Sequence, residues 1–369
     1  MKAIDLFAGV GGMSLGFTSA GIDVVLAIEK NAAIADGYRL NHPKSNVIVS
    51  GVEDLDIKRT FNAFKKNGGI DVIFGGPPCQ GFSQKGKRRK INDERNYLFK
   101  YFADVVSYLR PQLFVIENVP NILTTADSFF YEEIQNLFNK LGYDLKAKVL
   151  DSGDYGIPQR RKRALVVGQL SRNMFDFPTP GKHRVTIKDA ISDLPLILSG
   201  EGKECYPYPG LPSSQYQKTL RKNSIGIFNH QATRHSKLAL ERLAMIPKNG
   251  GGKSSLPKEH LTKSIYSGTW TRLHEDELAR TITTRFDTPS SGQFTLPWQD
   301  RCLTVREAAR IQSFPDRFIF TGTKSNQMLQ VGNAVPPLLA QAVAKQVLKA
   351  YKKDEGMDLM LEEKDINSA

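Results

Sequence analysis

The feature that most constrains the fold is an alternation of short apolar runs with helix-length amphipathic stretches over the first 170 residues. Amphipathic stretches such as 97–109 and 131–141 separate the apolar runs. The apolar runs, rich in β-branched residues, lie at residues 2–7, 24–28, 47–49, 72–74, 113–116 and 164–167. Apolar strands that alternate with helices predict a parallel sheet covered on both faces, so the predicted fold class is α/β.

The alternation ends after Gly168. Residues from about 171 to 290 are rich in Pro, Gly, Ser, Lys and His, which predicts a second, smaller and loop-rich domain with few long helices. Helical patterning returns at residues 304–313 and 338–351, and the last sixteen residues have the composition of a solvated tail. A chain of 369 residues is long enough for two domains.

A glycine-rich turn, Ala-Gly-Val-Gly-Gly at residues 8–12, follows the first predicted strand. Small residues there let a ligand approach the backbone and the helix N-terminus. Glu29 ends the next strand, twenty residues after Gly9, where a carboxylate can accept both hydrogen bonds of a ribose diol. Such a turn also serves strand-to-helix packing alone, so both readings stay open. Asp54, after the third strand, would lie near the base of a nucleoside or cap a helix.

Cys79 lies just beyond a predicted buried strand, in the sequence Gly-Pro-Pro-Cys-Gln-Gly-Phe-Ser at residues 76–83. Two prolines stiffen this loop, and open α/β sheets place their sites at this edge. Five cations follow at residues 85–90, and cationic surroundings lower the pKa of a thiol. Because the thiolate is the nucleophilic form, we interpret Cys79 as a reactive cysteine rather than a structural one.

The net charge of +13 favours a polyanionic partner. The tail at 354–369 holds six acidic residues and one lysine, so the rest of the chain is more basic than the total. Nine cations lie in two stretches, at 85–90 and 160–163. A basic run is often only a solvated face, but both runs lie beside the candidate site residues, so we interpret them as contacts to a polyanion.

Other classes of protein are disfavoured. Cys79, Cys205 and Cys302 are far apart and form no CxxC or Cys/His ligand spacing, which argues against a disulfide framework and against a metal site. No apolar run approaches the roughly 20 residues of a membrane span, and the start of the chain has no signal-peptide pattern. We therefore expect a cytoplasmic protein with no membrane association.

Six motifs, in order along the chain, resemble those of the DNA (cytosine-5)-methyltransferase family. The segment around Cys79 is similar to the catalytic loop of the family, and Glu117-Asn118-Val119 resembles its second catalytic motif. The six motifs lie at residues 3–17, 75–83, 117–119, 159–163, 301–316 and 330–337. The resemblance implies a bacterial or phage modification enzyme with a Rossmann-like, S-adenosylmethionine-dependent methyltransferase sheet.

The resemblance also implies a division of the chain. Residues 1–171 would form the catalytic and S-adenosylmethionine-binding domain, and residues 172–285 the target-recognition domain. Residues 286–353 would return to the catalytic domain, with the C-terminal helix packing on it. Residues 354–369 would form an acidic tail.

The resemblance implies that Cys79 adds to C6 of a cytosine flipped out of double-stranded DNA, which makes C5 electron-rich. Glu117 would contact N3 and the exocyclic amine, and Arg161 and Arg163 would orient the base. No metal is implied. The residues implied to hold the methyl donor, S-adenosylmethionine, are Phe7, Gly9, Gly11, Glu29, Asp54, Pro78, Leu98, Asn333 and Ala334.

Double-stranded DNA is the implied macromolecular partner. Arg310 and Gln312 are interpreted as a scaffold for the recognition region, and Cys302 as a small buried residue. The residues expected to contact DNA are Ser83, Lys87, Arg88, Arg89, Thr283 and Arg285. For Thr283 the alternative is an ordinary strand threonine, and for the lysines a solubilising surface.

Two other functions remain open. A branch of the same family modifies RNA, so the alternative enzyme is a tRNA cytosine-5 methyltransferase. The alternative of another class is a non-catalytic DNA-binding homologue, which the presence of Cys79, Glu117, Arg161 and Arg163 disfavours. We expect a monomeric enzyme that protects a short DNA site from a partner restriction endonuclease, although the sequence does not define that site.

Overall fold

The computed structural model describes residues 1–78, 97–124, 128–170, 175–181, 183–262 and 268–366, with side chains up to residue 353. The chain forms two compact units. The first unit comprises Met1–Asp151, Lys162–Pro180 and Leu339–Ala369, and the second comprises Ser152–Arg161 and Gly181–Leu338. Within the described ranges, no helix has the length and apolar character that would let it cross a membrane.

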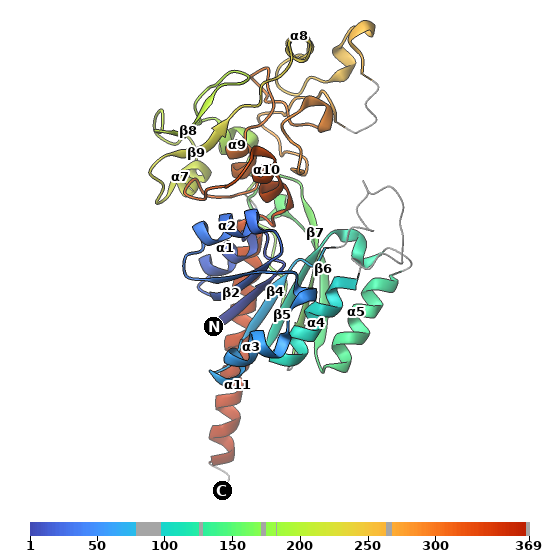
Figure 1. Cartoon of the computed structure of the whole chain (residues 1–369), viewed down its shortest axis with the longest axis vertical. Helices are drawn as coiled ribbons and strands as arrows, with labels where there is room; N and C mark the ends of the chain where they lie inside the picture. The colour runs from blue at the N-terminus through green and yellow to red at the C-terminus, as the bar shows by residue number, and fades with distance from the viewer. Residues whose placement is uncertain (79–96, 125–127, 171–174, 182, 263–267, 367–369) are drawn as a thin grey trace. The chain divides into compact units, whose positions relative to one another are not determined.

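A seven-stranded sheet with the strand order β3-β2-β1-β4-β5-β7-β6 forms the centre of the first unit (Figure 1). Strands β1 to β5 pair in parallel, which confirms the predicted α/β fold class. The strands are β1 (Lys2–Leu6), β2 (Asp23–Glu29), β3 (Asn46–Val49), β4 (Val72–Gly75), β5 (Leu113–Asn118), β6 (Asp144–Asp151) and β7 (Lys162–Gln169).

One edge of this sheet differs from the prediction of a wholly parallel sheet. Strand β7 pairs antiparallel with both β5 and β6. The sequence pattern also missed β6, because most of its side chains are exposed or half-buried and no continuous apolar run marks it. A strand at the edge of a sheet needs no such run, since only part of its surface is covered.

Five helices of the first unit follow its parallel strands and the turn after β5. The predicted helices at 97–109 and 131–141 are confirmed as α4 and α5, which lie side by side along the sheet (Figure 1). These helices are α1 (Gly12–Ser19), α2 (Ala32–Asn41), α3 (Ile57–Lys66), α4 (Leu98–Leu109) and α5 (Phe129–Lys140), with short 3-10 turns η1 (Val52–Asp54) and η4 (Pro120–Leu123). The apolar faces of α3, α4 and α5 pack with the sheet into one core.

The C-terminal helix α11 (Pro337–Ile366) is longer than predicted. It packs on the first unit, where Gln341 Nε2 donates to the Ser19 carbonyl at 3.1 Å and Tyr351 Oη donates to Asp71 Oδ1 at 3.1 Å. The backbone stays helical to Ile366, although the sequence favoured a solvated tail from residue 354. Eight of the thirteen residues from 354 to 366 are Leu, Met, Glu or Lys, which are good helix formers whether or not they pack against anything.

The second unit has short elements. A two-stranded antiparallel sheet joins β8 (Gly202–Tyr206) to β9 (Ile227–Gln231). The helices are α6 (Ile187–Ile191), α7 (Gln215–Arg221), α8 (Lys237–Met245), α9 (Val305–Ile311) and α10 (Lys324–Asn333), with 3-10 turns η5 (Ser152–Tyr155), η6 (Lys253–Ser255), η7 (Lys258–His260) and η8 (Pro289–Ser291). Because α9 packs on β9 and α6, the chain returns to the first unit at Leu339 and not at the expected residue 286.

Candidate functional site

The carboxyl ends of the parallel strands bring several predicted site residues to one edge of the sheet. The strand order reverses between β1 and β4, and open α/β sheets bind ligands at such a switch point. The glycine loop follows β1, Glu29 is the last residue of β2, and Glu117 lies one residue before the end of β5. Pro78 follows β4 and is exposed, and Leu98 is the half-buried first residue of α4.

The loop after β1 has a backbone that suits glycine. Phe7, Gly9 and Gly11 all have positive φ, at 62°, 57° and 89°, and α1 begins directly afterwards. A Cβ on Gly11 would lie 2.2 Å from His42 Nε2 and 2.8 Å from the Tyr38 ring, so no larger residue fits there. Around Gly9 nothing lies within 4 Å of such a Cβ. The loop therefore has one packed glycine and one glycine with free space beside it.

Glu29 holds the glycine loop in place. Its Oε2 accepts the Gly9 backbone N–H at 2.8 Å, and its Oε1 accepts that of Asn31 at 2.7 Å. Burial raises the pKa of Glu29, although these backbone hydrogen bonds oppose the rise. A carboxylate has about four lone-pair positions, so each oxygen keeps capacity for a further donor such as a hydroxyl. Gly9 and Glu29, which lie twenty residues apart in the sequence, are thus joined by a direct hydrogen bond.

Asp54 lies at the end of η1, beside a lysine that sequence reasoning did not single out. Lys30 Nζ is 2.7 Å from Glu53 Oε1 and 3.9 Å from Asp54 Oδ2. Gly51 makes this possible, since a Cβ there would lie 2.7 Å from Asp54 Oδ2. Asp54 stays exposed. The sequence signal that pointed to Lys30 was its position directly after Glu29.

Glu117 and Arg163 form an ion pair at the end of β5 and the start of β7. Arg163 Nε is 2.7 Å from Glu117 Oε1, and each side chain is less than 15% exposed, at 14% and 12%. The same corner reaches the loop after β4, because Asn118 Nδ2 donates to the Pro77 carbonyl at 2.9 Å. A Cβ on Gly76 would lie 2.9 Å from Glu117 Oε2. The first residues of the Pro-Pro-Cys loop therefore lie against the acidic motif.

Arg161 has a different environment from Arg163. It belongs to the second unit and is 1% exposed. Its Nη1 donates to the Ile282 carbonyl at 2.9 Å, and its Nη2 donates to the Gly332 carbonyl at 2.8 Å. The guanidinium thus joins the segment around Ile282 to the end of α10. The Arg161 side chain is buried and positions these two segments.

Four predicted residues lie elsewhere in the second unit. Asn333 is the exposed last residue of α10, and Ala334 caps that helix. Thr283 donates its hydroxyl to the Arg285 carbonyl at 3.3 Å, and the 64% exposed Arg285 side chain lies 3.4 Å from Asp287 Oδ1.

Five predicted residues lie outside the described part of the chain. They are Cys79, Ser83, Lys87, Arg88 and Arg89. Among the residues that the structure does describe, no three His, Cys, Asp or Glu side chains gather as a metal site would need.

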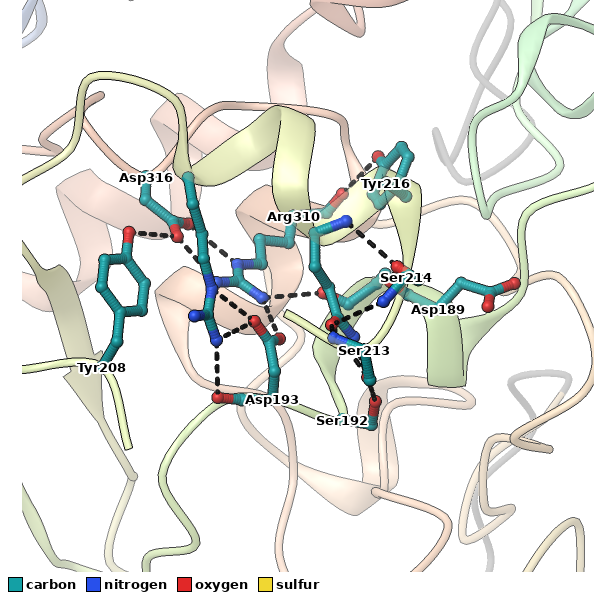
Figure 2. Close-up of polar contacts among 12 residues, drawn as sticks. Asp189, Ser192, Asp193, Tyr208, Ser213, Ser214, Tyr216, Arg310 and Asp316 are labelled. Atoms are coloured by element: carbon teal, nitrogen blue, oxygen red, sulfur yellow. Dashed lines mark hydrogen bonds and ion pairs between the residues drawn. The ribbon is translucent and has the colours of Figure 1, made fainter. Parts of the chain in front are cut away.

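Buried ion pairs hold the scaffold around α9, as predicted for Arg310. Figure 2 shows the Arg310 guanidinium between Asp193 and Asp316, with Tyr208 donating to Asp316 Oδ2 at 2.8 Å. Gln312 Nε2 donates to the Val331 carbonyl at 2.7 Å. Cys302 is 2% exposed, which confirms its interpretation as a buried residue. Asp193 lies more than one hundred residues from Arg310 in the sequence, so no local sequence pattern predicted this ion pair.

Comparison with known proteins places these features in context. The family model for C-5 cytosine-specific DNA methylase matches residues 1–349. A type II methyltransferase of Haemophilus parahaemolyticus, M1.HphI, is 39% identical over 94% of this chain and 86% of its own length. The type II methyltransferase M.DdeI of Desulfomicrobium norvegicum is 37% identical over 94% and 88%. A solved prophage-encoded DNA modification methyltransferase of E. coli superposes with a TM-score of 0.79 at 30% identity, covering 95% of this chain and 99% of that one.

Proposed function

The chain belongs to the C-5 cytosine-specific DNA methylase family, whose members are DNA (cytosine-5)-methyltransferases, and from this premise we propose that it methylates C5 of a cytosine flipped out of a specific double-stranded DNA site. The observation that carries the proposal is the Glu117–Arg163 ion pair, which lies against Gly76 while the adjacent Asn118 donates to the Pro77 carbonyl, at the start of the loop that contains Cys79. The Glu117 carboxyl and the Arg163 guanidinium thus lie beside the start of the loop that carries the proposed nucleophile, Cys79.

The glycine loop fits the methyl donor that the family implies. Gly9 has open space beside it, and Glu29 already fixes the loop while keeping lone pairs for ribose hydroxyls. We propose that Phe7, Gly9, Gly11, Glu29 and Asp54 hold the nucleoside end of the donor. Pro78, Leu98, Asn333 and Ala334 complete the proposed set. When bound, S-adenosylmethionine supplies an electrophilic methyl group on a sulfonium.

In the proposed reaction the Cys79 thiolate forms a bond to C6 of the cytosine, and C5 becomes electron-rich. Glu117 holds a proton at N3, and Arg163 fixes the Glu117 carboxyl. C5 takes up the methyl group, a base then removes the C5 proton, and Cys79 leaves as the C6–S bond breaks. Arg161 acts indirectly, because it joins the segment around Ile282 to the end of α10.

The proposed partner is double-stranded DNA, bound through Ser83, Lys87, Arg88, Arg89, Thr283 and Arg285. The cations of the loop would contact phosphates without reading sequence. Two relatives carry the name type II methyltransferase, which supports a restriction-modification role alongside an endonuclease.

The test supplies labelled donor to the full-length protein with duplex DNA or with tRNA. Label in DNA and its loss in Cys79→Ser support the proposal, as does a covalent adduct with a duplex containing 5-fluorocytosine. Label in tRNA alone would make the protein an RNA methyltransferase instead. Bisulfite sequencing of DNA from expressing cells then identifies the methylated site.

A further inference from the structure

The second unit contains a pocket between strand β9 and the start of helix α10. Its volume is about 270 Å³. Phe228, Val305 and Phe320 supply apolar lining, and the last two side chains are each 1% exposed. Polar residues complete the lining, among them Glu204 on β8 and Lys324 on α10. None of the described residues proposed above for catalysis, donor binding or DNA binding lines this pocket.

Lys324 brings a positive charge to the pocket. Its Nζ donates to the Gln231 carbonyl at 3.0 Å, and within the described part of the chain it forms no ion pair with a carboxylate. Burial lowers the pKa of Lys324; nearby Asp287 opposes this effect and Arg301 adds to it. Because a carbonyl is a weaker partner than an anion for a half-buried ammonium, an anion beside Lys324 would be favourable.

The start of α10 adds a second source of positive charge. Thr323 caps the helix, and its Oγ1 accepts the Asn326 N–H at 3.3 Å. Among the described residues, the backbone N–H groups from Gly322 to Ser325 have no hydrogen-bond partner. The first turn of α10 also contains no acidic residue. Since Gly322 and Lys324 both line the pocket, the positive end of the helix dipole lies beside the ammonium.

The other charges around the pocket do not cancel this potential. Glu204 is the acid in its lining, and it is exposed on β8, where water screens its charge. Behind the apolar lining, the fully buried Arg306 guanidinium lies 5.9 Å from the Phe320 ring. Asp316 is 3.8 Å from Arg306 but 2.6 Å from Arg310, so two cations share this acid. The described charges thus favour an anion over a cation.

We propose that this pocket binds a phosphate group, with Lys324 Nζ and the backbone N–H groups at the start of α10 as its donors. Helix N-termini bind phosphate through such N–H groups, and phosphate offers several acceptor oxygens to an ammonium and a helix end at once. The pocket also has room for a substituent on the phosphate. The site goes beyond the proposed function, which assigns no role to this pocket. Its phosphate belongs either to a nucleic acid backbone or to a free phosphate compound.

Equilibrium dialysis of the full-length protein with radiolabelled inorganic phosphate tests the site. Lys324→Gln should weaken phosphate binding by about tenfold, because it removes a charged donor. Lys324→Arg should retain most of the binding, since a guanidinium also binds phosphate. Glu204→Gln should tighten binding by about threefold, because it removes a like charge from the pocket. Other cationic segments that bind phosphate are the same in all these variants, so the differences report on this pocket.

The matched control is Lys237→Gln. Lys237 is also the first residue of a capped helix of the second unit, α8, whose first turn has no acid, but it does not line the pocket. Lys237→Gln should bind phosphate like the unsubstituted protein. An equal loss in both variants, or no loss in Lys324→Gln, would overturn the inference. Acetate that competes as well as phosphate would overturn the assignment of phosphate, because a pocket for a simple carboxylate would not distinguish the two anions.

A salt series of duplex DNA binding separates the two sources of the phosphate, and this part rests on the proposed function. If a DNA phosphate occupies the pocket, Lys324→Gln should lower the salt slope by about one, since one phosphate contact is lost. An unchanged slope together with weakened phosphate binding assigns the pocket to a free phosphate compound. Dialysis does not measure methylation, so a protein that binds phosphate here but methylates nothing would contradict only the proposed function.

Discussion

The two units satisfy their buried polar groups in different ways. In the first unit, a seven-stranded sheet pairs the backbone, and the largest fully buried side chains are aromatic, such as Phe74, Phe102 and Tyr143. In the described part of the second unit the largest are arginines, namely Arg161, Arg272, Arg301, Arg306 and Arg310. Short elements leave many carbonyls without a ladder partner, and a guanidinium offers five N–H donors to them.

Arg272 illustrates this difference. Its guanidinium donates to the carbonyls of Leu243, Ile246, Leu296 and Gln299, and it pairs with Asp300. One side chain thus replaces the hydrogen bonds that a sheet would provide to two separate segments, 243–246 and 296–300. A loop-rich unit of this kind depends on a few polar side chains, whereas the sheet depends on many apolar ones.

Breaking the Arg310 pairs should have the largest effect. Arg310→Met removes the cation that Asp193 and Asp316 share; these acids are 3% and 0% exposed, and Arg221 and Arg306, respectively, remain beside them. We expect a loss of about 3–5 kcal/mol in the free energy of unfolding, measured with urea. The matched control is Arg39→Met, which removes an exposed ion pair with Asp36 in the first unit and should cost less than about 1 kcal/mol. Similar losses in both variants would remove the contrast between the units.

Deleting a ring from the first unit should cost slightly less. Phe114 is fully buried, with ring centroids 4.1 Å from Phe138 and 5.2 Å from Tyr143. Phe114→Ala should lower the free energy of unfolding by about 3–4 kcal/mol, because a cavity replaces apolar contacts. The loss should be the same at pH 5 and pH 7, since burial raises the pKa of the neighbouring Tyr143 far above this range and the other ring partner, Phe138, does not ionise. A loss that depends on pH would contradict this account of the sheet core.

Acid should destabilise the second unit selectively. Although burial alone would raise the pKa of Glu307, its ion pair with Arg301 outweighs burial and lowers the pKa to about 2. The stabilisation is therefore complete above the unfolded value near 4.5 and is lost as the pH falls toward 2, by roughly 3 kcal/mol at most. Glu307→Gln should reduce the change in the urea midpoint between pH 6 and pH 3. An unchanged slope would show that another acid controls it.

The smallest effect concerns the C-terminal helix. Tyr351→Phe removes the hydrogen bond to Asp71 and should cost about 1 kcal/mol in thermal unfolding. Tyr101→Phe on α4, where the side chain is 41% exposed, is the control and should change nothing measurable. A loss above about 2 kcal/mol in Tyr351→Phe would mean that this single contact anchors α11.

The regular half of the molecule was predictable because its signals are local. Apolar runs located β1 to β5, a strand end located Glu29, and the resemblance to the family motif located Glu117. Edge strand β6 escaped, since only a few of its side chains are buried. Asp5 also escaped, because a single acid in an apolar strand does not reveal that its partner is Ser14.

The second unit was less predictable because its contacts join distant residues. Gln159 Nε2 donates to Gln312 Oε1 at 2.6 Å across more than 150 positions, and no periodicity records such a pair. The same holds for Arg161 and Gly332. Composition alone indicated a loop-rich region, and the helix at 304–313 was placed correctly without its partners.

The excursion of residues 152–161 into the second unit limits how the protein can be engineered. Gln159 and Arg161 bind Ile282, Gln312 and Gly332, yet they are encoded upstream of β7, apart from the rest of their unit. A chimera that took only residues 181–338 from a relative would contain carbonyl groups positioned for the relative's own arginine and not for Arg161 of this chain. Transplanting this unit as a working module therefore requires two inserts, one of ten residues and one of about 160.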